Sequence, residues 1–189
     1  NSKILFDRVA PGLDPLSPNN VYCIAPGPLS GTVLGMTSRM EVSTLSPYSG
    51  ILGDGNAGER FATVMKRARA DQLIVTGRAA KPRYLLITPQ TVELHDASNL
   101  WGKGAWETTD LLLAKHGARA SVACIGQAGE NLVRFASTIV DKYASAARGS
   151  GAVLGSKNVK AIVVVGDHAV TLADPETFKE LARLDREFF

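Results

Sequence analysis

The sequence predicts an α+β fold in which one structural unit occurs twice. Strand-length apolar or alternating segments lie between segments whose apolar residues have helical spacing. A glycine-rich turn, a short helix ending in basic residues and an Ile–Val strand closed by glycine occur in that order over 53–77 and again over 147–166. A strand-like segment with an arginine precedes each copy, Arg39 in the first and Arg134 in the second. The alternative is a chance match between common glycine turns.

The first half should contain two strands, a loop, a helix and a third strand. Apolar residues predict a short strand running into a Pro/Gly turn within 19–32, and alternating β formers predict another over 39–45. Glycine density predicts a loop over 47–58. Apolar residues three and four apart predict a helix within 59–70, and 72–77 is expected to be a buried strand.

The middle of the chain should form a hairpin, a helix and a strand. Two β-rich segments, 82–88 and 91–96, flank a Pro-containing turn and predict the hairpin. An amphipathic helix is expected over 106–117, where Gly117 would end it. The apolar segment 118–126 predicts the next strand.

The last third of the chain should contain both strands and helices. Segment 134–140 fits a helix or a strand, and we favour a strand. A short helix over 151–157 and a central strand over 160–166 should follow. The segment 174–189 predicts a helix that Asp174 caps.

Composition narrows the class of protein. The chain has 189 residues, 45% hydrophobic and 21% charged, with a formal net charge of +3, as is typical of one folded domain or two small ones. Basic residues are dispersed and no apolar run reaches membrane-spanning length, so we expect neither a nucleic-acid nor a membrane partner. Cys23 and Cys124 are the only cysteines, too few to ligate an iron–sulfur cluster within this chain. Low cysteine content predicts a cytoplasmic location.

The repeated unit predicts two anion sites. Each glycine-rich turn would present backbone N–H groups at a helix start to a negative ligand. If the duplication is real, the expected ligand carries two phosphates related by approximate two-fold symmetry.

Six motifs, in order along nearly the whole chain, resemble the N-terminal domain of the aldehyde ferredoxin oxidoreductases, which are tungsten- or molybdenum-containing pterin enzymes. The motifs are "APGPLSGT" (25–32), "SRMEVSTLSPYSG" (38–50), "GNAG" (55–58), "LWGKGAWETT" (100–109), "IGQAGENLVRFA" (125–136) and "GAVLGSKNVKAI" (151–162).

The resemblance implies an α+β domain of two intertwined sheet-and-helix repeats, forming a base for a bis-pterin cofactor. Magnesium would bridge the two pterin phosphates, and a 4Fe–4S cluster would have its ligands outside this chain. The implied reaction oxidises an aldehyde to a carboxylic acid with ferredoxin as electron acceptor. The platform domain would span 1–170, truncated at its start, and 171–189 would begin a helical domain. Other partners would be the rest of the polypeptide, with a homo-oligomer left open.

The resemblance assigns the first half of the site to one arginine and one loop. Arg39 matches an arginine between pterin and cluster, where its forked donors suit phosphate or sulfur acceptors. Asn56, Ala57 and Gly58 match the loop that cradles a phosphate, and the backbone carbonyl of Asn56 would bind magnesium. Glu59 departs from the family, which usually has a glycine there.

The second half departs further from the family pattern. Ser145 would supply the second magnesium carbonyl, and Arg148 would serve as the remaining phosphate arginine. Gly149 and Gly151 would keep the backbone open to the ligand. Ala144 replaces an arginine that binds phosphate in the family.

Two charged residues outside the proposed site and two rival functions remain to be considered. Glu130 should bond neighbouring loop backbone, and Lys157 should either balance phosphate charge or end its helix. The three histidines show no ligand spacing. Two rival functions are a nucleotide-binding fold, weakened by the lack of an acidic residue at ribose distance, and a cofactor-free scaffold related to the family. No catalytic acid or base can be assigned.

Overall fold

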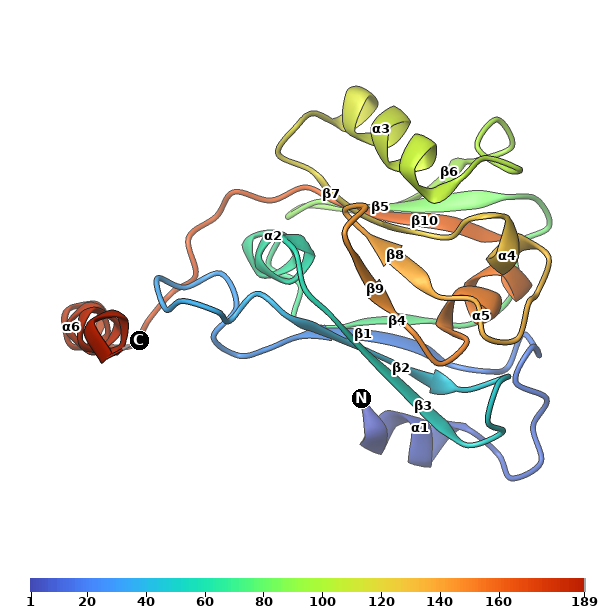
Figure 1. Cartoon of the computed structure of the whole chain (residues 1–189), viewed down its shortest axis with the longest axis horizontal. Helices are drawn as coiled ribbons and strands as arrows, with labels where there is room; N and C mark the ends of the chain where they lie inside the picture. The colour runs from blue at the N-terminus through green and yellow to red at the C-terminus, as the bar shows by residue number, and fades with distance from the viewer. Residues whose placement is uncertain (189) are drawn as a thin grey trace.

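The computed structural model describes residues 1–188, whose strands form two sheets (Figure 1). The strands are β1 (Tyr22–Pro26), β2 (Met40–Leu45), β3 (Leu52–Ala57), β4 (Leu73–Val75), β5 (Arg83–Ile87), β6 (Val92–Asp96), β7 (Ser121–Cys124), β8 (Thr138–Val140), β9 (Ala144–Ala146) and β10 (Val159–Val164). The helices are α1 (Ser2–Arg8), α2 (Phe61–Arg67), α3 (Ala105–His116), α4 (Gln127–Glu130), α5 (Ser150–Ser156) and α6 (Pro175–Phe188).

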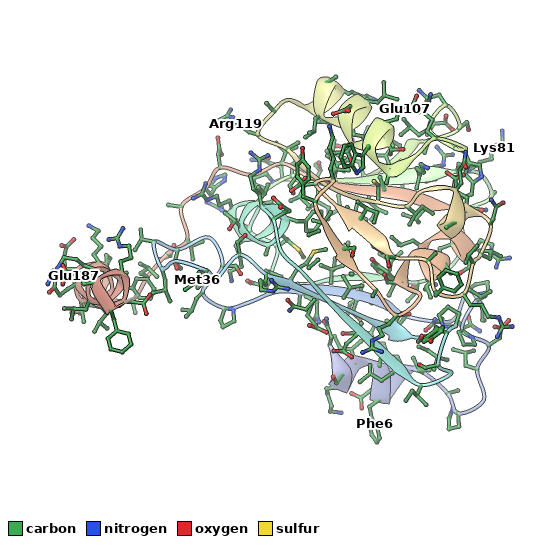
Figure 2. The ribbon with its side chains drawn as sticks, viewed as in Figure 1. Phe6, Met36, Lys81, Glu107, Arg119 and Glu187 are labelled. Atoms are coloured by element: carbon green, nitrogen blue, oxygen red, sulfur yellow. The ribbon has the colours of Figure 1, made fainter. Side chains whose placement is uncertain are left out.

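The two sheets lie one above the other with two helices between them (Figure 1). One sheet has the order β3-β2-β1-β4, and the other has the order β6-β5-β10-β7-β8-β9. The main core joins residues of both sheets with α2 and α5. Separate apolar clusters lie under α3 and under α1, whose Phe6 points away from the sheet and is 85% exposed (Figure 2).

The order and pairing of elements confirm the predicted duplication. Strands β1, β2, β3, helix α2 and strand β4 have the same succession as β7, β8, β9, α5 and β10, except that the second set has the additional short helix α4 between β7 and β8. In each set the first strand pairs antiparallel with both the second and the last. The hairpin β5–β6 extends only the second set.

The strand registers give residue equivalences between the two halves. Ile24 pairs with Val42 and Leu73, whereas Ala123 pairs with Val140 and Ile162. Left-handed backbone occurs at matching places as well. Before the helices these are Glu59 (φ 67°) and Arg148 (φ 62°), and after them Arg69 (φ 61°) and Asn158 (φ 56°).

The two halves are intertwined because each central helix packs on both sheets. Helix α2 contacts β1 of its own half and β7 and β10 of the other. Helix α5 contacts β8 and β10 of its own half and β1 and β2 of the other. Fully buried Phe61 and Met65 on α2, and Val153 and Leu154 on α5, form much of this interface. Burial of such side chains is the main source of stability between the halves.

The expected glycine-rich loop over 47–58 is wrong, because it contains strand β3. Inward and outward positions alternate along β3, and Gly53, Gly55 and Ala57 point inward. A Cβ atom on Gly55 would lie 2.7 Å from the backbone nitrogen of Ala147. Glycine therefore permits a close backbone contact here and does not prevent the strand.

The expected strand over 134–140 is correct only for its last part, β8. The residues before it form a turn in which the Ala136 amide donates to the Val133 carbonyl. The Ala136 carbonyl accepts from the Gly151 amide at the start of α5, at 2.9 Å. Strand β4 is also at the edge of its sheet and only half-buried, although we expected a buried strand.

The remaining elements agree with the sequence. The hairpin β5–β6 forms, α3 ends at Gly117 (φ 93°), and β10 lies inside its sheet between β5 and β7. Helix α6 begins at Pro175, and the Thr177 amide donates to the Asp174 carboxylate at 3.0 Å. Figure 1 shows α6 apart from the two sheets. No helix formed by residues 1–188 is long and apolar enough to cross a membrane.

Candidate functional site

The two predicted halves of the site adjoin, because edge strands β3 and β9 lie side by side. Small residues allow this approach: a Cβ atom on Gly53 would lie 3.1 Å from the Cβ of Arg148. A hydrogen bond fixes the junction, since Ser46 Oγ donates to the Arg148 carbonyl at 2.7 Å. The loops expected to hold the two ends of one ligand therefore lie next to each other.

Asn56 and Ser145 occupy equivalent positions in the two halves. Asn56 is the ladder partner of Glu41, next to Val42 on β2. Ser145 is the partner of Ile139, next to Val140 on β8, and Val42 and Val140 are themselves equivalent. Backbone carbonyls at two such positions are hard oxygen donors of the kind that magnesium prefers.

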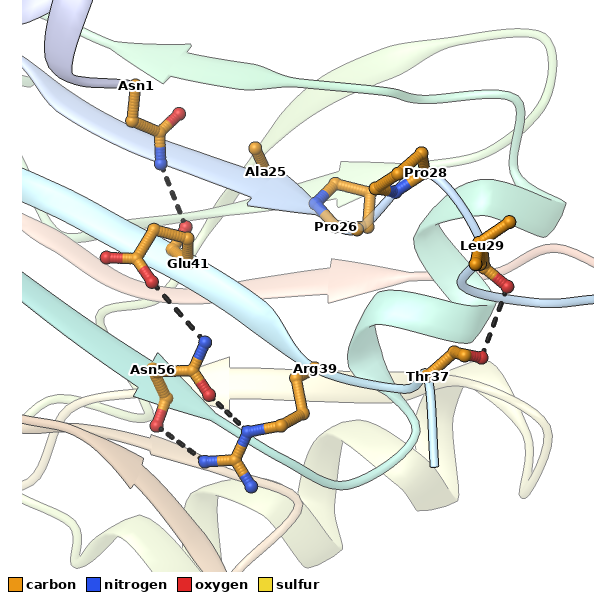
Figure 3. A pocket seen from close by; sticks show the side chains of 10 residues that line it. Asn1, Ala25, Pro26, Pro28, Leu29, Thr37, Arg39, Glu41 and Asn56 are labelled. Atoms are coloured by element: carbon orange, nitrogen blue, oxygen red, sulfur yellow. Dashed lines mark hydrogen bonds between the residues drawn. The ribbon is translucent and has the colours of Figure 1, made fainter. Parts of the chain in front are cut away.

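In the first half, Arg39, Asn56 and Glu41 form a hydrogen-bonded row (Figure 3). Arg39 Nε donates to the Asn56 side-chain oxygen, and its Nη2 donates to the Asn56 backbone carbonyl at 3.3 Å. Asn56 Nδ2 donates to Glu41 Oε2 at 3.4 Å. The row lines a pocket of about 400 Å³ whose other side includes Pro26 and Leu29.

The two charged side chains of this row, Arg39 and Glu41, differ in how far they are exposed to solvent. The Arg39 side chain is exposed, whereas Glu41 is half-buried on β2. Burial raises the pKa of the Glu41 carboxyl, the Asn56 hydrogen bond partly opposes this, and nearby Asp54 adds to the increase. The accessible end of the row is therefore the cationic one. Gly58 lies beside this cationic end. The one atom within 4 Å of a Cβ placed on Gly58 is Arg39 Nη1, at 3.8 Å.

In the second half, the glycines serve the packing of the chain itself. A Cβ atom would lie 2.4 Å from the Arg134 carbonyl oxygen if added to Gly149, and 2.4 Å from the Ser137 carbonyl oxygen if added to Gly151. Both residues are buried. We expected an open backbone at these two positions, but internal backbone contacts fill the space, because α5 starts directly against the turn before β8.

The start of α5 is held by a buried hydroxyl chain. Ser150 Oγ donates to the Ala146 carbonyl at 2.6 Å and accepts from the Thr138 amide at 3.1 Å. Thr138 Oγ1 also bonds the Tyr22 hydroxyl at 2.9 Å, which connects β8 to β1 of the other half. The second cradle is therefore hydrogen-bonded to strands of both sheets, with exposed Arg148 as its cation.

The two departures from the family pattern have distinct settings. Glu59 is exposed, and its carbonyl accepts from Ser38 Oγ at 2.6 Å. It is the counterpart of Arg148, so the two cradles carry opposite charges at equivalent left-handed positions. Ala144 starts β9 and packs against the main core.

Lys157, which the sequence left between balancing phosphate charge and ending its helix, has a structural role. Lys157 is the C-cap residue of α5, and its Nζ donates to the carbonyls of Pro18 (3.1 Å) and Asn20 (2.6 Å). Burial and nearby Arg78 lower the pKa of Lys157 to about 8. Lys157 thus ends α5 through its backbone, and its ammonium group faces these carbonyls and not the junction of β3 and β9. The position of Lys157 in an otherwise apolar segment was the feature of the sequence that could have indicated its burial.

Glu130 bonds loop backbone as expected and also has an ionic partner. The Gly102 amide donates to Glu130 Oε2 at 2.9 Å. Glu130 Oε1 forms an ion pair with Lys160, which is completely buried on β10.

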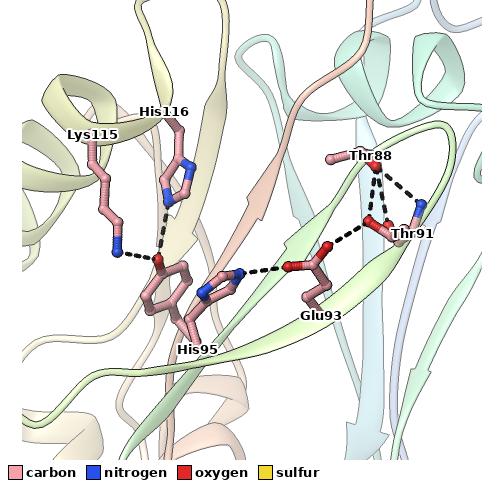
Figure 4. Close-up of polar contacts among 7 residues, drawn as sticks. Thr88, Thr91, Glu93, His95, Lys115 and His116 are labelled. Atoms are coloured by element: carbon pink, nitrogen blue, oxygen red, sulfur yellow. Dashed lines mark hydrogen bonds and ion pairs between the residues drawn. The ribbon is translucent and has the colours of Figure 1, made fainter.

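Two histidines far apart in sequence meet beside Tyr84 (Figure 4). The His95 ring stacks on Tyr84 with ring centroids 5.1 Å apart, and His116 Nε2 lies 3.1 Å from the Tyr84 hydroxyl. Lys115 Nζ donates to the same hydroxyl at 2.9 Å, and His95 bonds Glu93. Within residues 1–188, no group of three or more His, Cys, Asp or Glu side chains could hold a metal ion.

The residues at the junction fit an anionic ligand that carries a hard cation. Arg39 and Arg148 supply exposed positive charge, and Asn56 and Ser145 supply equivalent backbone oxygens. Arg39 bonds the Asn56 carbonyl here, so this donor would have to exchange partners for a metal.

Three comparisons place the chain among known proteins. The model of the aldehyde ferredoxin oxidoreductase N-terminal domain matches residues 1–166. The tungsten-containing aldehyde ferredoxin oxidoreductase of Pyrococcus furiosus is 42% identical over 182 residues, 95% of this chain and 30% of that protein. The aliphatic sulfonate oxidoreductase WOR-like subunit of the same organism is 35% identical over 187 residues, 90% of this chain and 30% of that protein.

A solved structure gives the same result for the fold. The active-site complex BamBC of benzoyl coenzyme A reductase, with bound 1,5-dienoyl-CoA, has a chain that is 41% identical to this one, with a TM-score of 0.94. The match covers 98% of this chain and 29% of that chain. The sequence thus spans about 30% of the length of the relatives it matches.

Proposed function

The chain belongs to the aldehyde ferredoxin oxidoreductase N-terminal domain family, and from this premise we propose that it is the cofactor-binding domain of a tungsten–pterin oxidoreductase. The observation that carries the proposal is the pair Asn56 and Ser145, which are equivalent by register on adjoining edge strands. Two equivalent donors at one junction suit a ligand with two like ends. Tungsten is the proposed metal because the Pyrococcus furiosus relative is a tungsten-containing enzyme.

Each residue of the junction has a role in this proposal. The Asn56 and Ser145 carbonyls would bind magnesium between two phosphates, and Arg39 and Arg148 would neutralise phosphate charge. Gly58 leaves room for a ligand beside Arg39. When bound, the metal–pterin group supplies the electron-transfer chemistry. This chain would orient that group and set the charge around it.

The proposed reaction oxidises an aldehyde to a carboxylic acid, with ferredoxin as the electron acceptor. A 4Fe–4S cluster between them would have its cysteines in another part of the polypeptide, because such a cluster takes four cysteines and this chain has only two, Cys23 and Cys124. Molybdenum is the alternative metal.

Metal analysis of the full-length protein tests the proposal. Cells grown with both tungstate and molybdate should yield protein with one of these metals and a phosphate-bearing pterin. Alanine substitution of both Arg39 and Arg148 should lower the pterin content, whereas substitution of exposed Arg119 should not. Protein that carries neither metal nor pterin would support the cofactor-free scaffold instead.

A second candidate is reduction of the aromatic ring of a coenzyme A thioester, in the same cofactor class. The solved chain from the benzoyl coenzyme A reductase complex matches 98% of this chain at 41% identity, close to the value for the aldehyde enzyme. Assays of the holoenzyme with aldehydes and ferredoxin, and with an aromatic coenzyme A thioester and a low-potential donor, discriminate between the two. Activity in only one assay decides the substrate class.

A further inference from the structure

The amide of Asn56 lies between a group that only accepts hydrogen bonds and a group that only donates them. Its Nδ2 donates to the Glu41 carboxylate at 3.4 Å, and its Oδ1 accepts from Arg39 Nε (Figure 3). Glu41 and Asn56 face each other directly in the β2–β3 ladder, so the strand register sets this pairing.

This arrangement permits only one orientation of the amide. An ionised carboxylate has no proton to donate, and a guanidinium has no acceptor. Turning the Asn56 side chain by half a turn would direct its NH₂ group at Arg39 and its oxygen at Glu41, and both hydrogen bonds would be lost. Arg39, which only donates, and ionised Glu41, which only accepts, therefore select the same orientation of the Asn56 amide from its two ends.

We propose that Glu41 is a positioning residue that holds the Arg39 guanidinium in the pocket through the side chain of Asn56. Arg39 is otherwise an exposed, flexible side chain, whose other hydrogen bond is the 3.3 Å contact to the Asn56 carbonyl. The neighbouring carboxylate, Asp54, lies on the same face of β3 but forms no hydrogen bond to Asn56 among the described residues.

The consequence for the ligand rests on the proposed function. A guanidinium fixed before binding loses less conformational entropy when it bonds a phosphate, so Glu41 would increase cofactor affinity without touching the cofactor. The position of Arg39 itself can be measured without any cofactor, so the two ideas can fail separately.

The experiment uses full-length protein from cells grown without tungstate or molybdate. 2,3-Butanedione modifies accessible arginines, and peptide mass spectrometry gives the modification rate at Arg39, with exposed Arg119 as the internal reference. The variants are Glu41→Ala, Glu41→Gln and the double variant Glu41→Gln/Asn56→Asp. Asp54→Asn is the matched control, because it removes a nearby negative charge and leaves the row intact.

Loss of Glu41 should raise the rate at Arg39 roughly three- to tenfold, the population change that corresponds to one net hydrogen bond. Glu41→Gln should have the smaller effect, because its amide tolerates both orientations of Asn56. The double variant should restore the wild-type rate, because the amide introduced at position 41 would donate to the carboxylate introduced at position 56. The other oxygen of that carboxylate would accept only from Arg39. Asp54→Asn should leave the rate unchanged.

Equal rates in wild type, Glu41→Ala and Glu41→Gln, or no recovery in the double variant, would overturn the proposal. If Glu41→Ala fails to fold, the Gln and double variants still decide it, since they keep the side-chain volumes. In holoenzyme, Glu41→Gln should lose pterin faster during dialysis and the double variant should recover. Wild-type protein without pterin would contradict the proposed function but leave the Arg39 rates as an independent result.

Discussion

Lys160 and Glu130 form an ion pair that is almost completely removed from solvent, with side-chain exposures of 0% and 4%. Lys160 Nζ also donates to the Lys103 carbonyl at 2.7 Å, and Glu130 Oε2 accepts from the Gly102 amide. The pair thus connects β10, the end of α4 and the turn before α3.

Removal of one partner of this pair should destabilise the chain strongly. Glu130→Ala leaves the Lys160 ammonium buried without a counter-charge, which should cost about 3–5 kcal/mol of the free energy of unfolding. Equilibrium urea unfolding measures this loss. The exposed pair Lys103–Glu107 is the control, where Glu107→Ala should cost less than about 1 kcal/mol. Equal losses in the two variants would refute the buried pair as an anchor.

Gly55→Ala should separate the two halves of the site. The added Cβ would lie 2.7 Å from the Ala147 nitrogen, so β3 and β9 must move apart. We expect a loss of about 1–3 kcal/mol in stability, from overpacking, and a lower tungsten content in the full-length protein. Gly35→Ala is the control, because nothing lies within 4 Å of its Cβ position. Unchanged metal content in Gly55→Ala would argue against a site at this junction.

Arg148→Ala should weaken cofactor retention without unfolding the protein. Its side chain is exposed, and the bond that fixes this turn uses the Arg148 carbonyl, which alanine keeps. Loss of a charge-assisted bond to phosphate should lower pterin affinity roughly tenfold or more. Pterin release, followed by fluorescence after oxidation, measures the change, with Arg119→Ala as the reference variant. A melting temperature far below that of the wild type would show instead that Arg148 is structural.

Stability should fall in mild acid because of His116. Burial, Lys115 and His95 lower its pKa from the ordinary 6.5. The folded state therefore disfavours the imidazolium. The titration of His116 leaves the free energy of unfolding unchanged above about pH 6.5. It lowers the free energy of unfolding as the pH falls from about 6.5 through the pKa of His116 in the folded state. Unfolding between pH 7 and 5 should show a smaller loss of stability in His116→Asn than in the wild type. Identical slopes in the two proteins would contradict this.

Local signals predicted much of the secondary structure correctly. Gly117 marked the end of α3 and Asp174 the start of α6, because capping depends on residues within one turn. The prediction for segment 47–58 was wrong because glycine in isolation disfavours a strand. The reason for glycine at position 55 is the backbone of Ala147, which is distant in sequence. The same holds for Lys157 and Lys160, whose partners lie on other elements.

The sequence by itself determined the family, the duplicated unit and the two segments in which the candidate site lies, because motif order and periodicity are local properties of the chain. Only the tertiary structure decided that Asn56 and Ser145 occupy equivalent register positions, that Gly149 and Gly151 face the chain itself, and that Asn56 joins Glu41 to Arg39. These relationships depend on which backbone lies within a few ångströms of another, and that is set by the packing of two sheets around α2 and α5.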